Sequence, residues 1–332
     1  MSRYVADGNK FGMLIESGTY ATTSGAGIWV GQVQDHTPDE SFPREMIRYQ
    51  GANTRNVSAF ADLVIDLAGT FNYYPQNWRM LGYALGSNVD AGAAGSYTHT
   101  MSETESTDSN AFTSGTTAPF MSFGLVDVHQ FNPTGLNFIR NYNGCMVDSF
   151  SLTASQGEIL NCEVGYIAQE VTTGSSGLGI TVTADTARPY IYADTVVHWP
   201  SGTKVDYVNS WGLTINNNLE AKHYANGSKE VYLPQPLNRD YELSISVDST
   251  SDKAYTYYNQ YYKGGSEFNL LLEVNIASPA KKLFVSLSGC EITQMETPSP
   301  IEGIDEQTMT ITPKACSAVA TDAVEKYNAW WL

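Results

Sequence analysis

The sequence contains no run of about 18 consecutive apolar residues, the length that a membrane-spanning helix needs. Its first residues, MSRYVADGNK, lack the charged and then apolar layout of a signal peptide. The chain has 35 acidic and 18 basic residues and a formal charge of −17, and its Lys and Arg residues form no cluster in the sequence. A surface that grips nucleic acid or an anionic membrane needs concentrated cations, so the composition argues against both. We expect a soluble protein that folds in a reducing cytoplasm and has no membrane partner.

Residues with metal-binding or nucleophilic chemistry are few and scattered. The four cysteines have no C-x-x-C spacing and are too sparse for a disulfide scaffold, and we expect Cys162 to be a small core residue. None of the five histidines forms an H-x-x-x-H or H-x-E arrangement, and no nucleophile elbow, phosphate-binding loop, dinucleotide fingerprint or EF-hand loop occurs. We therefore predict no catalytic residue, no metal ligand and no cofactor. A metal site assembled from residues far apart in the chain stays open at this point.

What is abundant points to β-structure. Charged residues make up only 16% of the chain, while Gly, Ser, Thr, Asn and Tyr are frequent, which is typical of β-rich proteins. The segment 142–171 shows this best, because apolar and polar residues alternate on both sides of the turn residues Ser155, Gln156 and Gly157. The segment therefore predicts a β-hairpin with one buried face.

A similar pattern returns later in the chain. Gly-Cys at 144–145 recurs at 289–290, again at the start of alternating runs that continue to Met309 and Ile311. Before each pair we expect a strand and then a short helix ended by glycine: strand and helix at 62–67 and 75–86 in the first copy, and at 242–248 and 251–264 in the second. A duplicated fold is predicted. The alternative is a single irregular β-protein, whose two halves look alike only because the order strand, helix, strand is common in proteins.

The repetition divides the chain into two tandem domains. The flexible stretch 172–179, TTGSSGLG, places the boundary near residue 175 and gives domains at 1–175 and 176–332. The first contains an extended N-terminal arm and a polar loop at 87–119, a length that is usually functional or mobile. The second ends in an aromatic tail, whose large side chains require a cover. Either the tail's own domain or a neighbouring subunit supplies that cover.

Several segments together resemble the tail tube proteins of long-tailed, siphovirus-type bacterial or archaeal viruses. The segments that carry the resemblance are ESGTY at 16–20, WVG at 29–31, WRMLG at 78–82, YTHT at 97–100, GCMVDSFSL at 144–152, PYIY at 189–192 and VNSWGLTINNNLE at 208–220. The likeness spans nearly the whole chain, but its motifs are structural and include no catalytic signature. The polar loop is unusually long for this family.

The resemblance implies a mainly β fold: two tail-tube-like β-sandwich or partial-barrel domains, each with one short flanking helix. It implies a structural virion protein without enzymatic activity, located in the virion tail and assembled in the host cytoplasm. Three chains would form a pseudo-hexameric ring, and stacked rings would form a tube for genome delivery. The implied partners are other copies of the chain, tail terminator and baseplate or tail-tip proteins, a tape measure protein in the lumen, and viral DNA that passes without specific binding.

An acidic lumen would repel phosphates and let DNA slide, because wall charges act within a screening length of about 8 Å at physiological salt. The residues expected to face the lumen are Asp62, Asp66, Asp148, Glu163 and Glu242. The alternative for each is ordinary solvent-facing polarity. The residues expected between subunits or rings are Tyr20, Trp29, Tyr97, His99, Tyr327, Trp330 and Trp331.

Two other functions compete with this interpretation. Twenty-one Tyr and six Trp also suit a monomeric carbohydrate- or surface-binding β-sandwich, which would gain stability when its sugar binds. A hydrolase whose residues converge only in space has no motif in its support. The state of assembly in solution separates the first alternative from a tube.

Overall fold

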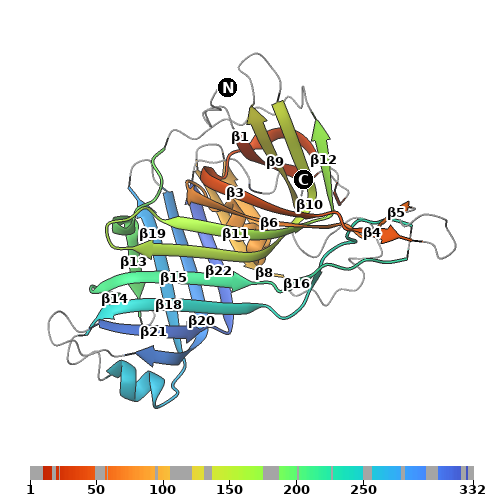
Figure 1. Ribbon diagram of the computed structural model, residues 1–332. Coiled ribbons are helices and arrows are strands. Elements are labelled where there is room, and N and C mark those ends of the chain that lie inside the picture. The colour runs from red at the N-terminus through yellow and green to blue at the C-terminus, as the bar shows by residue number, and fades with distance from the viewer. Residues whose placement is uncertain are drawn as a thin grey trace, which may run out of the picture.

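The computed structural model describes residues 10–16, 20–21, 23–48, 57, 59–93, 96–104, 122–130, 137–174, 187–199, 202–225, 227–249, 256–277, 281–296, 306–322 and 327. Antiparallel strands dominate these residues, which confirms the mainly β prediction. Two large layers of sheet pack face to face, and their strands run across one another (Figure 1). Apolar side chains of both layers meet in one cluster between them.

The layer at the front of Figure 1, named here the long sheet, is a continuous run of antiparallel pairs. Its strands in order are β3 (Gly31–Ser41), β6 (Asp66–Pro75), β11 (Asn161–Ala168), the second half of β10 (Asn137–Ser155), β15 (Val208–Asn216), β18 (Asp240–Asp248), β21 (Glu306–Thr312) and the second half of β20 (Lys281–Glu296). In β18, Leu243, Ile245 and Val247 are buried and alternate with more exposed polar residues. Burying each such side chain contributes about 1.5–3 kcal/mol, which fixes the face that the strand turns inward.

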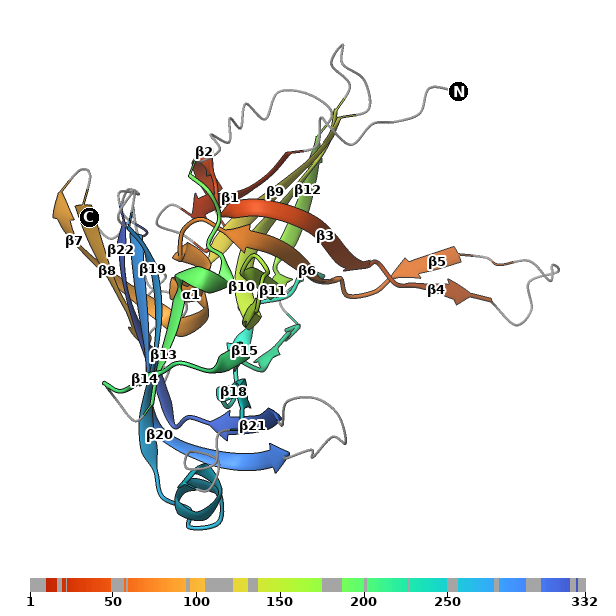
Figure 2. The same ribbon diagram turned by 90° about the vertical axis from the view of Figure 1, so that its left-hand side faces the viewer.

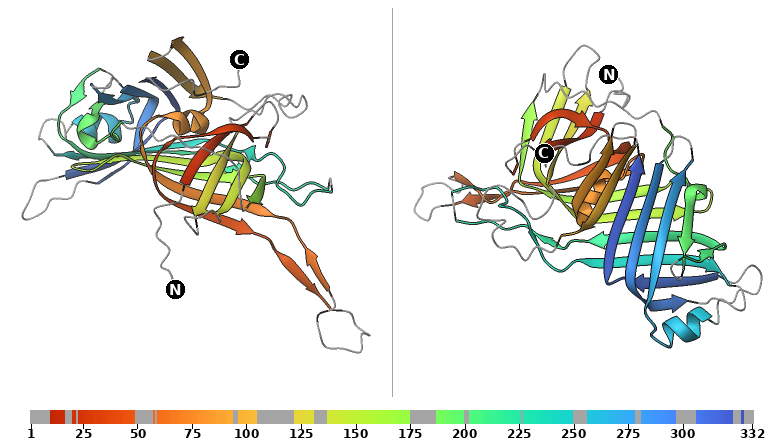
Figure 3. Two further views of the ribbon diagram at one scale, coloured as in Figure 1. Left: turned by 90° about the horizontal axis from the view of Figure 1, so that it is seen from above. Right: turned by 180° about the vertical axis from the view of Figure 1, so that it is seen from behind.

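The second layer, the crossing sheet, lies in front when the molecule is seen from behind (Figure 3). Its strands in order are β7 (Gly86–Ala93), β8 (Ser96–Glu103), β22 (Ala315–Asp322), the first half of β20, β19 (Phe268–Ile276), β13 (Thr195–His198) and β14 (Lys204–Val205). Strand β20 therefore belongs to both layers.

A smaller group, the short sheet, branches from β10 in the same way. Its strands in order are β2 (Thr23–Ile28), β1 (Lys10–Glu16), β9 (Phe123–Gln130), the first half of β10 and β12 (Glu170–Gly174). Two hairpins lie outside the three sheets. The first arm pairs β4 (Arg44–Ile47) with β5 (Ala59–Asp62) and projects from the body (Figure 2), and the second arm pairs β16 (Leu219–Glu220) with β17 (Gln235–Pro236).

Helical structure is confined to three short segments of the described chain. Helix α1 (Arg79–Leu85) ends at Gly86, whose φ of 92° allows its N–H to bond the carbonyl of Gly82, as the predicted glycine stop requires. All seven helical residues are buried, and Pro75 ends β6 rather than opening the helix. The others are the 3-10 turn η3 (Tyr192–Asp194) and the π-helical turn η4 (Tyr257–Tyr262), which lies inside the predicted second helix.

The same strand pairings occur twice along the chain. The first set is β1–β2, β1–β9, β9–β10, β10–β12, β10–β11, β11–β6, β6–β3 and β4–β5, and the second is β13–β14, β13–β19, β19–β20, β20–β22, β20–β21, β21–β18, β18–β15 and β16–β17. The two sets are joined by the pairs β10–β15 and β8–β22.

Two expected elements differ from the observed ones. The predicted polar loop at 87–119 begins instead with the β7–β8 hairpin, because β8 gains a pairing partner, β22, from the far end of the chain. The rest of the expected loop, from 105 to 119, lies outside the described residues. The predicted strand 62–67 is also wrong, because Asp62 ends β5 and Asp66 begins β6, with residues 63–65 between them.

Candidate functional site

The strands of the long sheet contribute carboxylates and hydroxyls to its outward face, but no Lys or Arg. None of the strand segments that form this sheet contains either residue. Ser and Thr fill much of the outward face, for example at Thr153, Ser244 and Thr308. We name this surface the carboxylate face. The outward carboxylates are Asp35, Asp39, Asp66, Glu163, Asp240, Glu242, Asp248, Glu291, Glu296 and Glu306. At the edge of this surface, Lys314, which follows β21, lies 3.7 Å from Glu291.

Three of the five acidic residues singled out from sequence lie on the carboxylate face. Glu163 of β11 and Glu242 of β18 are exposed at the middle of the sheet. Asp66 lies at the start of β6, where its Oδ1 is 2.8 Å from Nε2 of His223.

The other two acidic residues contact groups of the second half of the chain. Asp62 of the first arm lies 2.9 Å from Nε of Arg44 and 3.3 Å from Nζ of Lys229. The hydrogen bond and charge of Lys229, together with Arg44, lower the pKa of Asp62. Asp148 accepts a hydrogen bond from the N–H of Leu219 at 2.7 Å. Asp62 therefore connects the first arm to the segment between β16 and β17, and Asp148 connects the long sheet to the second arm.

At the β10–β15 junction the two sets of pairings share one sheet. Seven residues of β10, from Ser149 to Ser155, pair with residues 216 down to 210 of β15. Beside the junction, the buried Asn217 donates from Nδ2 to the carbonyl oxygens of Val147 at 2.8 Å and Ala84 at 3.0 Å. The junction therefore joins two repeated units by main-chain hydrogen bonds and a buried amide, as an interface between two subunits would.

The β8–β22 junction contains a buried histidine. His99 lies between two carboxylates: Nδ1 is 2.6 Å from Asp90 and Nε2 is 3.1 Å from Asp322. The ring of Tyr327 stacks on His99 at 3.6 Å between centroids, and its hydroxyl donates to Asp322 at 2.7 Å. Burial alone would lower the pKa of His99, but the hydrogen bonds and charges of Asp322 and Asp90 raise it above its usual value.

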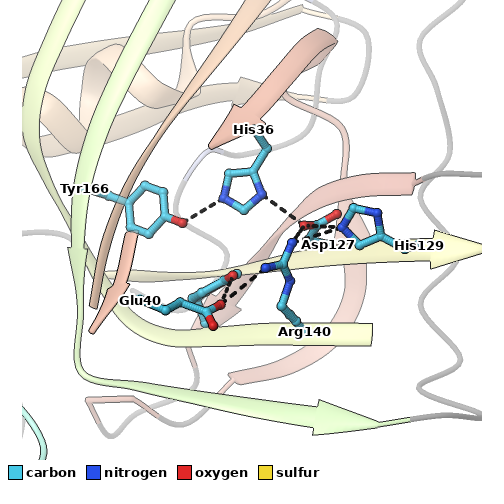
Figure 4. Close-up of polar contacts among 7 residues, drawn as sticks. His36, Glu40, Asp127, His129, Arg140 and Tyr166 are labelled. Atoms are coloured by element: carbon cyan, nitrogen blue, oxygen red, sulfur yellow. Dashed lines mark hydrogen bonds and ion pairs between the residues drawn. The ribbon is translucent and has the colours of Figure 1, made fainter. Parts of the chain in front are cut away.

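A polar cluster lies beneath β3 and connects it to the short sheet (Figure 4). His36 of β3 lies 3.1 Å from Asp127 of β9, which also accepts a hydrogen bond from Arg140 of β10 at 2.7 Å. Glu40 of β3 accepts one from the hydroxyl of Tyr142 at 2.6 Å. Burial would raise the pKa of Asp127, yet His36, with the charges of His129 and Arg140, lowers it. The edge strand β3 is thereby held by buried ionic contacts.

A hollow of about 390 Å³ opens beside this cluster. Its lining includes Phe11 and Trp29 as well as His36 and Asp127. It is a concave place where an aromatic ring and charged groups converge, which are the features that a small polar ligand contacts. Within the described residues, no group of His, Cys, Asp and Glu is arranged to hold a metal ion.

The aromatic residues expected between subunits have contacts inside the chain. Tyr20 donates its hydroxyl to the carbonyl of Gly144 at 2.8 Å, and Trp29 donates its indole N–H to Gln76. Tyr97 lies over His99, with ring centroids 6.3 Å apart. His99 and Tyr327 are fully buried within the chain, so the aromatic tail is covered by its own chain at this residue. Trp330 and Trp331 lie outside the described residues.

Sequence reasoning missed the residues that contact one another across long separations. His36 and Asp127 are 91 positions apart, and His99 and Asp322 are 223 positions apart. No local spacing connects them. The absence of Lys and Arg from the strands of the long sheet is visible in the sequence, because all 18 basic residues fall outside these strand segments.

Repeated sets of strand pairings joined edge to edge in one sheet make this a chain built from side-by-side β units. The chain belongs to the phage tail tube protein family, because the model of that family matches residues 11–313. No curated protein matches the chain. Membership of this family places the protein in the virion tail, where it assembles with itself and with other tail components. In the described part of the chain, no helix is long and apolar enough to cross a membrane.

Proposed function

We propose that this chain forms trimeric, pseudo-hexameric rings that stack into the tube of a siphovirus-type tail. The observation that carries the proposal is the β10–β15 junction, where two units with the same pairings share one sheet. Units joined in this way form a closed ring when the rotation between neighbours is a whole fraction of a turn. Three chains with two tube domains each, 1–175 and 176–332, supply six such units.

In this ring the carboxylate face lines the lumen. Strands without Lys or Arg offer no cations that could replace the counterions condensed on the DNA phosphates, so DNA passes without being held. Glu163 and Glu242, exposed at the middle of the face, are the central lumen residues. A tape measure protein occupies the lumen before DNA enters, and tail terminator and baseplate or tail-tip proteins cap the tube. The protein acts as a conduit without enzymatic activity and is assembled in the host cytoplasm.

Negative-stain electron microscopy of the purified full chain at several concentrations, with size-exclusion chromatography, tests the proposal. We expect rings or hollow tubes of uniform bore. Monomers at every concentration, with thermal stability that rises on addition of a glycan, would favour the carbohydrate-binding alternative instead. The hollow beside Phe11 and Trp29 is where such a sugar would be sought.

A further inference from the structure

We propose that β3 of one chain pairs with the second half of β20 of a second copy, in the register that β15 and β10 use inside the chain. This contact rests on the proposed ring function and specifies how the ring closes. The two sets of pairings are equivalent residue by residue, and this equivalence supports the contact.

Strand β20 is the counterpart of β10. Each strand has a glycine with positive φ, Gly144 at 66° and Gly289 at 59°, followed by a buried cysteine. Each then has a register shift against its hairpin partner, between 147 and 149 in β10 and between 292 and 294 in β20. Each of these positions in β20 lies 145 residues after the matching position in β10, so the two strands align without an insertion or deletion.

Strand β3 is the counterpart of β15. The register shifts between Val33 and Asp35 against β6, and between Val208 and Ser210 against β18. Each of these positions in β15 lies 175 residues after the matching position in β3. The same bulge in the same place means that the two strands present their outer edges in the same way.

These equivalences fix the register of the proposed contact. The first three internal pairs, those of Ser149, Phe150 and Ser151, have counterparts among described residues. For the other four pairs, the counterparts in the β20 chain are residues 297–300, which lie outside the described part. The internal pairs and their counterparts are Ser149–Asn216 with Gln294–Ser41, Phe150–Ile215 with Met295–Glu40, and Ser151–Thr214 with Glu296–Asp39.

The two edges are open for this pairing. In the described chain, β3 pairs with β6 alone, and residues 291–296 of β20 pair with β21 alone. Ser41 and Gln294 are both exposed. An open edge presents unpaired N–H and C=O groups that another strand satisfies, so a second copy would extend the long sheet without rearranging it.

The arms add charge complementarity to the contact. Inside the chain, His223 of the segment after β16 contacts Asp66 of β6. Residues of the two arms correspond at an offset of 175, and residues of β6 and β18 correspond at an offset of 174. The counterpart of His223 is therefore Arg48, and the counterpart of Asp66 is Asp240. A basic residue thus faces an acidic one in both cases, although the residue types differ.

A second pair at the base of the arms follows the same rule. Leu219 packs against the cluster formed by Met146 and Leu233. The counterparts of Leu219 and Met146 are Arg44 and Glu291, which carry opposite charges. In contrast, Asp39 and Glu296 would lie opposite each other on the water-facing side of the sheet, and the repulsion between their like charges opposes the pairing. The contact between copies is therefore more ionic than its apolar internal template.

Disulfide trapping in the full chain tests the register. Chains with Ser41→Cys and chains with Gln294→Cys are mixed, oxidised mildly and run on a non-reducing gel; the four native cysteines are buried. We expect a covalent dimer at least ten times as abundant as in the matched control that replaces Ser41→Cys with Thr37→Cys. Thr37 is exposed on the same face but four residues away, about 13 Å along the strand, which is beyond disulfide reach.

The internal template provides a positive control. The double variant Ser149→Cys with Asn216→Cys should form a disulfide within one chain and change its mobility without forming a dimer. Electron microscopy of the mixed single variants completes the test. Rings without the Ser41–Gln294 cross-link, or with equal cross-linking at Thr37, would overturn the proposed contact but not the tube. If the mixture forms no rings and no cross-linked dimers, both the proposed contact and the proposed tube are overturned.

Discussion

At the scale of single residues, the most informative group is the buried His99 with its two carboxylates. Its imidazole contacts Asp90 and Asp322, and Tyr327 covers one face of the ring. Tyr327 also accepts a hydrogen bond from the N–H of Trp78, next to α1, at 2.9 Å. The group therefore joins the β7–β8 hairpin, β22 and the residues before α1 around one imidazole ring.

The raised pKa of His99 predicts a pH-dependent stability. A group whose pKa is higher in the folded protein stabilises it fully below the unfolded value of about 6.5 and loses that effect as the pH rises through the folded value. We expect the melting temperature to fall as the pH is raised above about 6.5, and this part of the fall to be absent in His99→Gln. The variant should also be less stable by about 3 kcal/mol below that pH, because it leaves two buried carboxylates without their cation.

The partly exposed histidine His223 gives the control for this experiment. Its contact with Asp66 is partly solvated, so His223→Gln should change the free energy of unfolding by less than about 1 kcal/mol. An unchanged pH dependence of melting in His99→Gln would show that His99 is not the titrating group.

At the scale of elements, β10 and β20 are the strands that pass from one sheet to another, and each does so near its positive-φ glycine. An alanine at either position meets the left-handed penalty of about 1–2 kcal/mol. At Gly144 an added Cβ would also lie 2.9 Å from the Tyr20 ring and 2.9 Å from the Cβ of Gln169, whereas at Gly289 it would lie 2.9 Å from the flexible side chain of Lys314.

We therefore predict that the two alanine variants differ. Gly289→Ala should cost about 1–2 kcal/mol. Gly144→Ala should cost about 1–3 kcal/mol more, because Tyr20 must move and lose its hydrogen bond to the Gly144 carbonyl. Urea unfolding of both variants measures the difference. Equal losses would mean that Tyr20 does not constrain this corner.

The elements also show what sequence reasoning can reach. Alternation predicted the hairpin of β10 and β11 with its turn at Gly157, because strand residues two positions apart lie on the same face of the sheet and are buried or exposed together. It also predicted the buried side of β18 and the pairing of β20 with β21. The β10–β15 and β8–β22 pairs were not predicted, because no local signal says which distant strand an edge will meet. The predicted loop from 87 failed for this reason.

At the scale of the whole molecule, the carboxylate face predicts an electrostatic effect on genome passage. Glu163→Lys with Glu242→Lys changes two exposed side chains that pack against no core, so tubes should form normally. Phosphates would then meet cations at the wall, and genome ejection should slow. The double variant with Gln at both positions is the matched neutral control and should lie between the Lys variant and the original.

Ejection kinetics from particles that carry each variant provide the measurement, at low and at high salt. The difference between the variants should shrink as salt is added, because the screening length falls from about 10 Å at 0.1 M to about 3 Å at 1 M. Equal ejection rates for all three would indicate that these residues do not face the passing genome.

The β7–β8 hairpin has a consequence for symmetry. It follows α1 in the first half of the chain, whereas in the second half only residues 263–267 separate η4 from β19. A ring of three chains would therefore look sixfold along the strands that both halves share, yet display only three copies of this hairpin. Any protein that docks on it would find three equivalent places, spaced 120° apart, on a tube whose bore repeats every 60°.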